Sequence, residues 1–151
     1  MENLQTLGLR HAALYVEDPQ RSKAFYMRVL RMKLEWEPDA DNVYLTSEGQ
    51  DNLALHREDR AEGLKSDPGS SQSAGPSPGS LGRLDHLGFA LAELEQVDAW
   101  YEWVKSQGAP ILRETKTHRD GARSFYFQDP DGVVIQMIYH PPIAARAKQG
   151  N

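Results

Sequence analysis

Two histidines occupy matching positions in two similar stretches of the sequence. His11 stands in the run LRHAAL at residues 9–14 and His86 stands in LDHLGF at residues 84–89, an offset of 86 − 11 = 75 positions. Gln136, a third polar side chain, interrupts an apolar run near the end of the chain. Imidazole nitrogens and an oxygen donor suit Fe(II), Mn(II), Zn(II) or Ni(II), any of which polarises a bound substrate. The alternative is that each histidine only forms a hydrogen bond within a sheet.

The elements that must position these side chains repeat in the same order in both halves. Apolar, β-prone runs predict the strands that contain the histidines. Asp18 and Pro19 predict a helix start, and the apolar residues that follow recur at helical spacing. The expected order is therefore βαβββ, linker, βαβββ. The expected strands cover residues 9–16, 33–37, 42–47, 51–57, 84–91, 111–118, 122–128 and 133–139, and the helices follow Asp18 and Leu94.

A segment rich in small and polar residues divides the chain. Residues 66–82 contain 6 Ser, 3 Pro and 4 Gly among 17 residues, a composition that cannot bury enough apolar surface to offset its ordering entropy. We therefore expect a linker at residues 66–83, a first module at 1–65, a second module at 84–143 and a disordered tail at 144–151. Modules of ~60 residues are too small to stand alone, so the two should form one domain.

Composition excludes several classes of protein. The formal net charge is −5, which argues against a nucleic-acid partner because phosphates require a basic surface. The chain has no cysteine, which excludes disulfides, zinc thiolates and iron–sulfur clusters. No apolar run approaches the ~20 residues that cross a bilayer, and the first residues lack the features of a secretory signal. We expect a cytoplasmic protein with no membrane partner.

Alternation along strands assigns two more side chains to the candidate site. Tyr15 shares the face of His11, where it can donate a hydrogen bond to substrate, with core packing as the alternative. His56 lies near the end of its strand, either as a substitute ligand or as a group that faces substrate. The sequence contains no Gly-rich phosphate loop and no Ser/His/Asp arrangement, and no catalytic residue is assigned.

Taken together, these residues resemble the vicinal oxygen chelate superfamily, which has the glyoxalase/bleomycin-resistance/extradiol-dioxygenase fold. The resemblance implies the α+β class, with two βαβββ modules that form a curved, partly open mixed sheet around a metal, often in a homodimer. The matching motifs are His11, Leu14-Tyr15-Val16-Glu17-Asp18-Pro19, Phe25-Tyr26, Val29-Leu30, Met32, Leu34, Asp85-His86-Leu87 and Phe127-Gln128-Asp129-Pro130-Asp131-Gly132 with Ile135-Gln136.

The resemblance also implies which residues bind the metal. Its ligands come from the first, fourth, fifth and eighth strands, which assigns His11, His86 and Gln136 and leaves Ala54 at a position that cannot ligate. A hairpin that borders the cavity in this fold adds His118 and Arg119 as residues that contact substrate.

We expect an enzyme of dioxygenase or lyase type that binds a divalent metal and chelates a small, oxygen-rich substrate. Gln136 departs from the glutamate common in the family, since it is neutral and cannot act as a base. Together with Ala54, this departure favours the alternative, a metal-free protein of the bleomycin-resistance type that sequesters a small molecule. A structural or regulatory dimer with a vestigial site is the third possibility.

Overall fold

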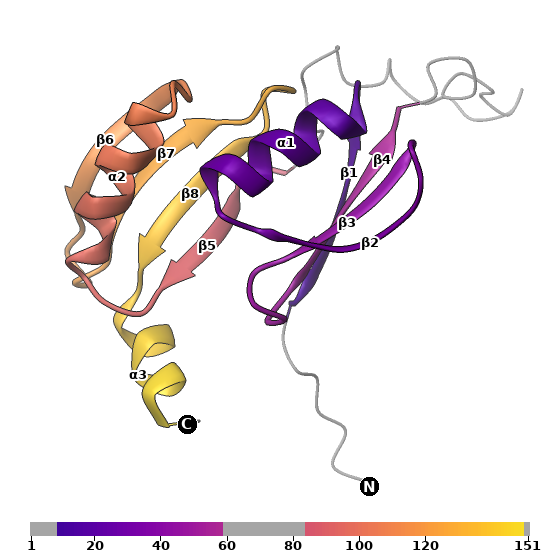
Figure 1. Cartoon of the computed structure of the whole chain (residues 1–151). Helices are drawn as coiled ribbons and strands as arrows, with labels where there is room; N and C mark the ends of the chain where they lie inside the picture. The colour runs from indigo at the N-terminus through magenta and orange to yellow at the C-terminus, as the bar shows by residue number, and fades with distance from the viewer. Residues whose placement is uncertain (1–8, 59–83, 150–151) are drawn as a thin grey trace, which may run out of the picture. The chain divides into compact units, whose positions relative to one another are not determined.

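A computed structural model describes residues 9–58 and 84–149 (Figure 1). The chain divides into two compact units, Met1–Asp67 and Pro68–Asn151, which are described separately. The linker expected at residues 66–83 lies outside the described residues. Each unit contains a four-stranded mixed sheet, which confirms the expected α+β class and the repeated βαβββ order.

The first unit has the strand order β1-β4-β3-β2, with β1 parallel to β4 and the other pairs antiparallel. Its elements are β1 (His11–Val16), α1 (Pro19–Val29), β2 (Lys33–Asp39), β3 (Asn42–Thr46) and β4 (Asn52–Arg57). The second unit repeats this topology as β5-β8-β7-β6, with β5 parallel to β8. Its elements are β5 (Leu87–Leu91), α2 (Gln96–Ser106), β6 (Ile111–Thr117), β7 (Arg123–Gln128), β8 (Val134–Tyr139) and α3 (Pro141–Gln149).

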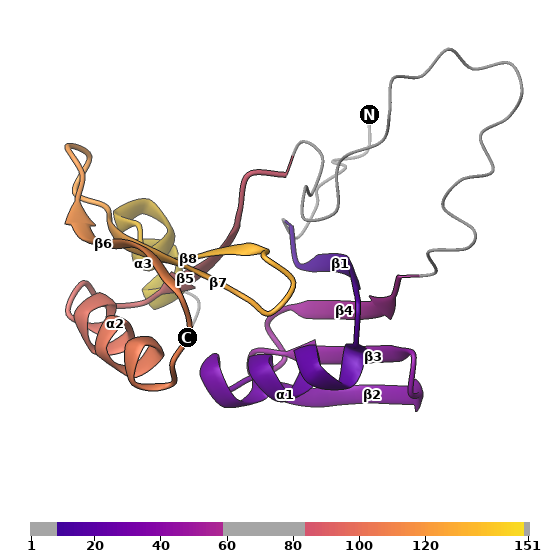
Figure 2. The ribbon, with the colours of Figure 1, turned by 90° about the horizontal axis from the view of Figure 1, so that it is seen from above.

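Helix α1 begins where the sequence predicts. The Asp18 carboxylate accepts hydrogen bonds from the backbone N–H groups of Gln20 and Arg21, at 2.9 and 3.3 Å, and Pro19 fits the first turn because its missing N–H needs no partner there. The residues that recur at helical spacing after Pro19 are all buried: Ser22, Phe25, Tyr26, Val29 and Leu30. Helix α1 packs on β3 and β4, and α2 packs on β6, β7 and β8, so each covers one face of its own sheet (Figure 2).

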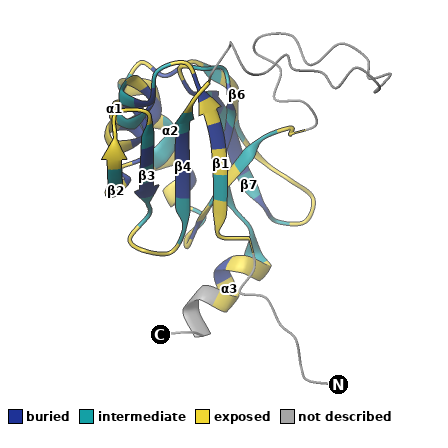
Figure 3. Ribbon diagram, turned by 90° about the vertical axis from the view of Figure 1, so that its right-hand side faces the viewer, coloured by how far each residue is buried: buried dark blue, intermediate teal, exposed yellow. Residues whose placement is uncertain are grey.

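Burial alternates along the strands, so each sheet has a core face and an opposite face. In β3 and β4 the core-facing side chains are almost completely buried, whereas β2 at the sheet edge is mostly exposed (Figure 3). The core-facing strand residues of the first unit are Leu14, Val16, Val43, Leu45, Leu53 and Leu55, and those of the second include Leu91, Phe125, Phe127, Ile135 and Met137. The opposite faces carry the histidines and most other polar side chains.

An ion pair ties each helix to its own sheet. Lys23 of α1 pairs with Glu37 of β2, and this contact is the main cause that lowers the pKa of Glu37. Arg123 of β7 donates to both carboxylate oxygens of Asp98 in α2, at 3.1 and 2.6 Å, and this contact holds the pKa of Asp98 below its ordinary range. Fork-shaped guanidinium–carboxylate pairs of this kind fix orientation as well as distance.

The end of the chain differs from the expectation. Residues 144–151 were expected to be a disordered tail, but α3 occupies Pro141–Gln149 and Ala144 is buried. The two prolines, 141 and 142, resemble a helix stop, yet proline is also favoured in the first turn of a helix. The carbonyl of His140 accepts from the N–H groups of Ile143 and Ala144, both at 3.0 Å, and closes that turn. Within the described residues, no helix has the length and apolar character needed to cross a bilayer.

Candidate functional site

His11 is the first residue of β1, on the exposed face of the sheet. Its Nδ1 lies 2.6 Å from Oδ1 of Asn52, the residue directly opposite it on β4. The Asn52 amide has a fixed orientation because its Nδ2 donates to the Glu35 carboxylate, which can only accept. The Asn52 oxygen therefore faces His11 and accepts from Nδ1–H, and the lone pair of the imidazole stands on Nε2.

His86 has the same hydrogen-bond arrangement in the second unit. It directly precedes β5, and its Nδ1 lies 2.5 Å from a carboxylate oxygen of Asp85. Because a carboxylate accepts, this contact also places the proton on Nδ1 and the lone pair on Nε2. The His86 ring meets the Tyr126 ring edge-on, with centroids 5.4 Å apart and planes at 89°.

Gln136 is buried in β8 beside Tyr126, the residue that the His86 ring also contacts. Only 8% of it is exposed, and its Nε2 donates to the Tyr126 hydroxyl at 2.7 Å. Its amide oxygen lies beside Gly88, where a Cβ would stand 3.5 Å from Oε1. The structure thus brings His86 and Gln136 together through Tyr126, on the face opposite α2.

Sequence reasoning missed Tyr126, although a signal for it was present. Phe125 and Phe127 are completely buried on the core face of β7, so alternation places the residue between them on the other face. Tyr126 is also the residue directly opposite Gln136. Pairing β7 with β8 from the sequence would have placed this tyrosine beside the candidate ligand.

The pairing register also identifies the counterpart of Gln136 in the first unit. Ala13 faces Ala54 across β1 and β4, and Gly88 faces Gln136 across β5 and β8. Ala13 and Gly88 are separated by 88 − 13 = 75 positions, the offset of the two histidines. Ala54 therefore occupies the position equivalent to Gln136, and its methyl group supplies no donor atom.

The donor chemistry of the residues expected to bind a metal suits a divalent cation. In the neutral form of His11 and of His86, these contacts leave the lone pair on Nε2, and histidine ligands typically donate their other ring N–H to an oxygen acceptor in this way. Gln136 adds an amide oxygen held in place by Tyr126. Within the described residues, no three His, Cys, Asp or Glu side chains form a cluster that could hold a metal, so the expected ligand set depends on the amide.

His56 has a third hydrogen bond of the same type. Its Nδ1 lies 2.7 Å from Oδ1 of Asn42, whose Nδ2 donates to Asp39 at 2.9 Å. The hydrogen bond from Asn42 is the main cause that lowers the pKa of Asp39. In its neutral form, His56 therefore also carries its lone pair on Nε2, on the open face of the first sheet.

Aromatic rings surround His56 on that face. Its ring centroid lies 5.7 Å from that of Tyr44 and 6.4 Å from that of Tyr15, and Trp36 stacks on Tyr44 at 5.1 Å. Tyr15 is 73% exposed and Trp36 is 59% exposed within this chain. Tyr15 does not pack into the core, and the open face of the first sheet is both aromatic and accessible.

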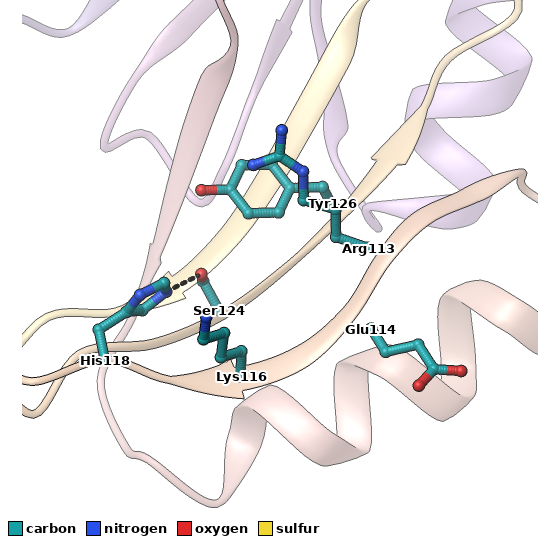
Figure 4. Close-up of a pocket in the computed structure, with 6 residues that line it drawn as sticks. All are labelled: Arg113, Glu114, Lys116, His118, Ser124 and Tyr126. Carbon is teal, nitrogen blue, oxygen red and sulfur yellow. Dashed lines mark hydrogen bonds between the residues drawn. The ribbon is translucent and has the colours of Figure 1, made fainter.

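A pocket of about 160 Å³ opens on the corresponding face of the second sheet (Figure 4). His118 is one of its lining residues, with Nε2 3.1 Å from the buried Ser124 hydroxyl. Arg119 is exposed and is not among the lining residues. The full lining is Arg113, Glu114, Lys116, His118, Ser124 and Tyr126.

Side-chain alternation along β6 does not predict that the two cations of this pocket, Arg113 and Lys116, lie on the same face of the sheet. Arg113 and Lys116 are three residues apart, so simple alternation places them on opposite faces of β6. Arg113 pairs with Tyr126 and Lys116 pairs with Ser124, and the register shifts between these two pairs. This irregularity places both cations beside open-face residues of β7.

These features accord with the sequence relationships of the chain. Residues 8–137 match the Glyoxalase/Bleomycin resistance protein/Dioxygenase superfamily, and the chain belongs to that superfamily. The match confirms the resemblance drawn from the motifs.

Individual relatives are more distant. The chain is 27% identical over 131 residues to the metallothiol transferase FosB of Staphylococcus saprophyticus. This alignment covers 86% of this chain and 75% of the relative. Lactoylglutathione lyase from Agrobacterium tumefaciens has a similar structure, with a TM-score of 0.67, 19% identity and coverage of 89% and 94% of the two chains. TioX from Micromonospora sp. ML1 gives a TM-score of 0.63 at 18% identity, with coverage of 88% and 98%. At these identities the two structural matches show the fold alone.

Proposed function

We propose that this protein is a metal-dependent enzyme of the superfamily that binds a divalent metal through His11, His86 and Gln136. The metal is of the Fe, Mn, Zn or Ni type, and the substrate is a small, oxygen-rich molecule that undergoes dioxygenase- or lyase-type chemistry. The observation that carries the proposal is the matched hydrogen bonding of the two histidines, in which Nδ1 faces an oxygen acceptor and Nε2 is the nitrogen left for a metal. The metallothiol transferase relative is consistent with a metal-dependent activity.

The residues of the site have distinct tasks in this proposal. A bound divalent metal supplies Lewis-acid polarisation of the substrate oxygens. Asn52 and Asp85 hold the protons of the two imidazoles on Nδ1, which keeps Nε2 available. Tyr126 accepts from the Gln136 amide nitrogen and leaves its oxygen as the donor atom. Because Gln136 does not titrate, it moves no proton, and substrate deprotonation must come from another group.

Metal analysis and calorimetry of the purified full-length protein test the proposal. We expect one equivalent of Mn(II), Ni(II), Zn(II) or Fe(II) per chain, and a loss of affinity of at least tenfold in both His11→Ala and His86→Ala. His118→Ala is the matched control, because it removes an imidazole outside the proposed ligand set and should leave metal affinity unchanged. Absence of stoichiometric metal, or unchanged metal content in His86→Ala, would refute the proposal.

The second candidate function is metal-free binding of an aromatic small molecule. Two observations favour it: the neutral donor set with Ala54 in place of a fourth ligand, and the exposed rings of Trp36 and Tyr15 on the open face of the first sheet. Aromatic rings of this kind provide large contact areas for planar ligands. Calorimetry with planar aromatic ligands separates the two functions, since sequestration predicts an affinity that a chelator does not change and that falls in Trp36→Ala.

We also propose that the protein forms a homodimer, as its resemblance to the superfamily implies. Light scattering coupled to size-exclusion chromatography should give twice the 17.0 kDa mass of the chain. A monomer at micromolar concentration would contradict this proposal without affecting the metal assignment.

A further inference from the structure

We propose that the pocket between β6 and β7 binds an oxyanion group of the substrate, such as a phosphoryl or a related anionic oxygen group. The pocket combines two cations, an imidazole, a buried hydroxyl and a phenol in about 160 Å³. This inference rests on the proposed function for its link to the reaction, since it names the chemical class of the substrate. Oxyanion binding itself requires no metal.

The two cations of the pocket have no counter-charge among the described residues. Neither Arg113 nor Lys116 forms an ion pair there. Glu114 is the one carboxylate in the lining, and Figure 4 shows it directed away from both cations, toward α2. In a chain of net charge −5, the pocket therefore contains two cations that no ion pair of the described residues neutralises, which favours an anionic ligand.

The lining orients its donors toward a ligand. The Arg113 guanidinium lies over the Tyr126 ring, 5.1 Å from its centroid. This cation–π contact orients the guanidinium group and leaves its N–H groups available to donate hydrogen bonds. Lys116 adds a point charge from the neighbouring pair of the ladder. Planar and point-like cations in one pocket are the usual means of binding phosphoryl oxygens.

A buried hydroxyl completes the donor set. Ser124 is only 1% exposed, and its Oγ lies 3.1 Å from Nε2 of His118. When the imidazole nitrogen donates to Oγ, the hydroxyl proton is left to donate to a ligand. Ser124 is therefore a buried lining residue whose hydroxyl adds a donor to the two cations of the pocket.

Tyr126 connects this pocket to the proposed metal ligands. Its ring supports Arg113 and contacts the His86 ring, while its hydroxyl accepts from Gln136. An oxyanion bound between β6 and β7 therefore lies on the same face of the second sheet as two of the proposed ligands. The substrate class that follows is a small molecule with an anionic oxygen group at one end and metal-binding oxygens at the other.

Titration of the full-length protein with inorganic phosphate tests the inference. The measurement is calorimetry or NMR at constant ionic strength in the presence of chelator, with chloride in place of phosphate as the salt control. We expect saturable binding of phosphate but not of chloride, weakened at least tenfold in Lys116→Met and in Arg113→Met. Arg119→Met removes an equal charge from the adjacent hairpin without touching the pocket, and it should retain the wild-type affinity.

Three results would overturn the inference. They are linear, unsaturable shifts with phosphate, an unchanged affinity in Lys116→Met, and an equal loss in Arg119→Met, which would reveal non-specific charge attraction. The test is separable from that of the metal site. His86→Ala should keep phosphate binding within twofold, and Lys116→Met should keep metal affinity within twofold, so either proposal can fail alone.

Discussion

Replacement of Gln136 by glutamate is the most direct probe of the proposed ligand set. The substitution preserves shape and adds one negative charge at a position that is 8% exposed. The Tyr126 hydroxyl, 2.7 Å from Nε2 in the present structure, can reverse its role and donate to the new carboxylate. The variant should therefore fold with Tyr126 still in contact.

The Gln136→Glu substitution should lower the free energy of unfolding without metal and should tighten metal binding. Without metal, burial of a carboxylate with one hydrogen bond costs about 1–3 kcal/mol of the free energy of unfolding. Burial raises the pKa of the new carboxyl, so this cost is absent at low pH, grows as pH rises through the ordinary glutamate range and is complete above the raised value. With metal, the added charge attracts the dication, and we expect a net gain of ~1.4–2.8 kcal/mol, or ten- to a hundredfold tighter binding.

Calorimetric metal titration and thermal unfolding with and without metal provide the assay. Gln128→Glu is the matched control, because Gln128 lies on the same face of β7, two residues from Tyr126, and donates only a 3.5 Å contact to the Gly132 carbonyl. It adds the same charge without replacing a proposed ligand. Unchanged affinity in Gln136→Glu, or equal tightening in Gln128→Glu, would refute the assignment of Gln136 as a ligand.

Three further substitutions test individual contacts. Gly88→Ala should raise the free energy of unfolding by about 0.5–1 kcal/mol, since its Cβ meets only ordinary contacts at 3.5 and 3.9 Å, and should weaken metal binding several-fold by crowding the facing amide oxygen. Asn52→Leu should lower metal affinity about tenfold by removing the acceptor that fixes the His11 tautomer, which ¹⁵N NMR of the ring reports. Asp98→Asn should be destabilising at pH 7 but not at low pH, because Arg123 lowers the pKa of Asp98 and its stabilisation is lost as pH falls through that lowered value.

Each of these predictions has a result that contradicts it. A Gly88→Ala variant with unchanged metal affinity would show that the amide oxygen does not face the ligand. Retention of the Nδ1–H tautomer in Asn52→Leu would show that the hydrogen bond is not what sets it. For Asp98→Asn, a loss of stability that is independent of pH would mean that charge plays no part in the contact, with Asp120→Asn as an exposed control.

Local chemistry made most of the fold predictable. Asp18 and Pro19 specify the start of α1 through capping and ring geometry, and the apolar spacing after them specifies its buried face. Helix α3 was missed for a related reason, because Pro141 obeys two rules that point in opposite directions. Proline can stop a helix or occupy its first turn, and the sequence around Pro141 does not tell these two cases apart. The burial of Ala144 shows that a helix begins here.

The candidate site was predictable only in part. His11, His86 and Gln136 follow from strand parity, and Tyr126 follows from the same rule once β7 is paired with β8. Contacts that depend on how the strands are ordered in the sheet could not be predicted. From the sequence, Glu35 is an ordinary solvent-exposed carboxylate. Only the placement of β2 relative to β4 makes it the acceptor for the Asn52 amide.

The pocket cations illustrate a further limit. Arg113 and Lys116 share a face because of an irregularity in the pairing of β6 with β7. No single residue in that strand marks the irregularity, since the residues between the two cations are Glu114 and Thr115. Side-chain periodicity is reliable in a regular ladder and fails where the ladder shifts.

Tyr126 belongs to both halves of the proposed site, and this has a thermodynamic consequence. Its ring face supports Arg113 and its hydroxyl restrains Gln136, so a ligand that displaces either neighbour alters the other. Binding at the two positions is then coupled, and the coupling free energy is a single quantity: whatever factor the oxyanion applies to metal affinity, the metal applies to oxyanion affinity. Replacement of this tyrosine by phenylalanine keeps the ring and removes the hydroxyl, so it separates the two binding events.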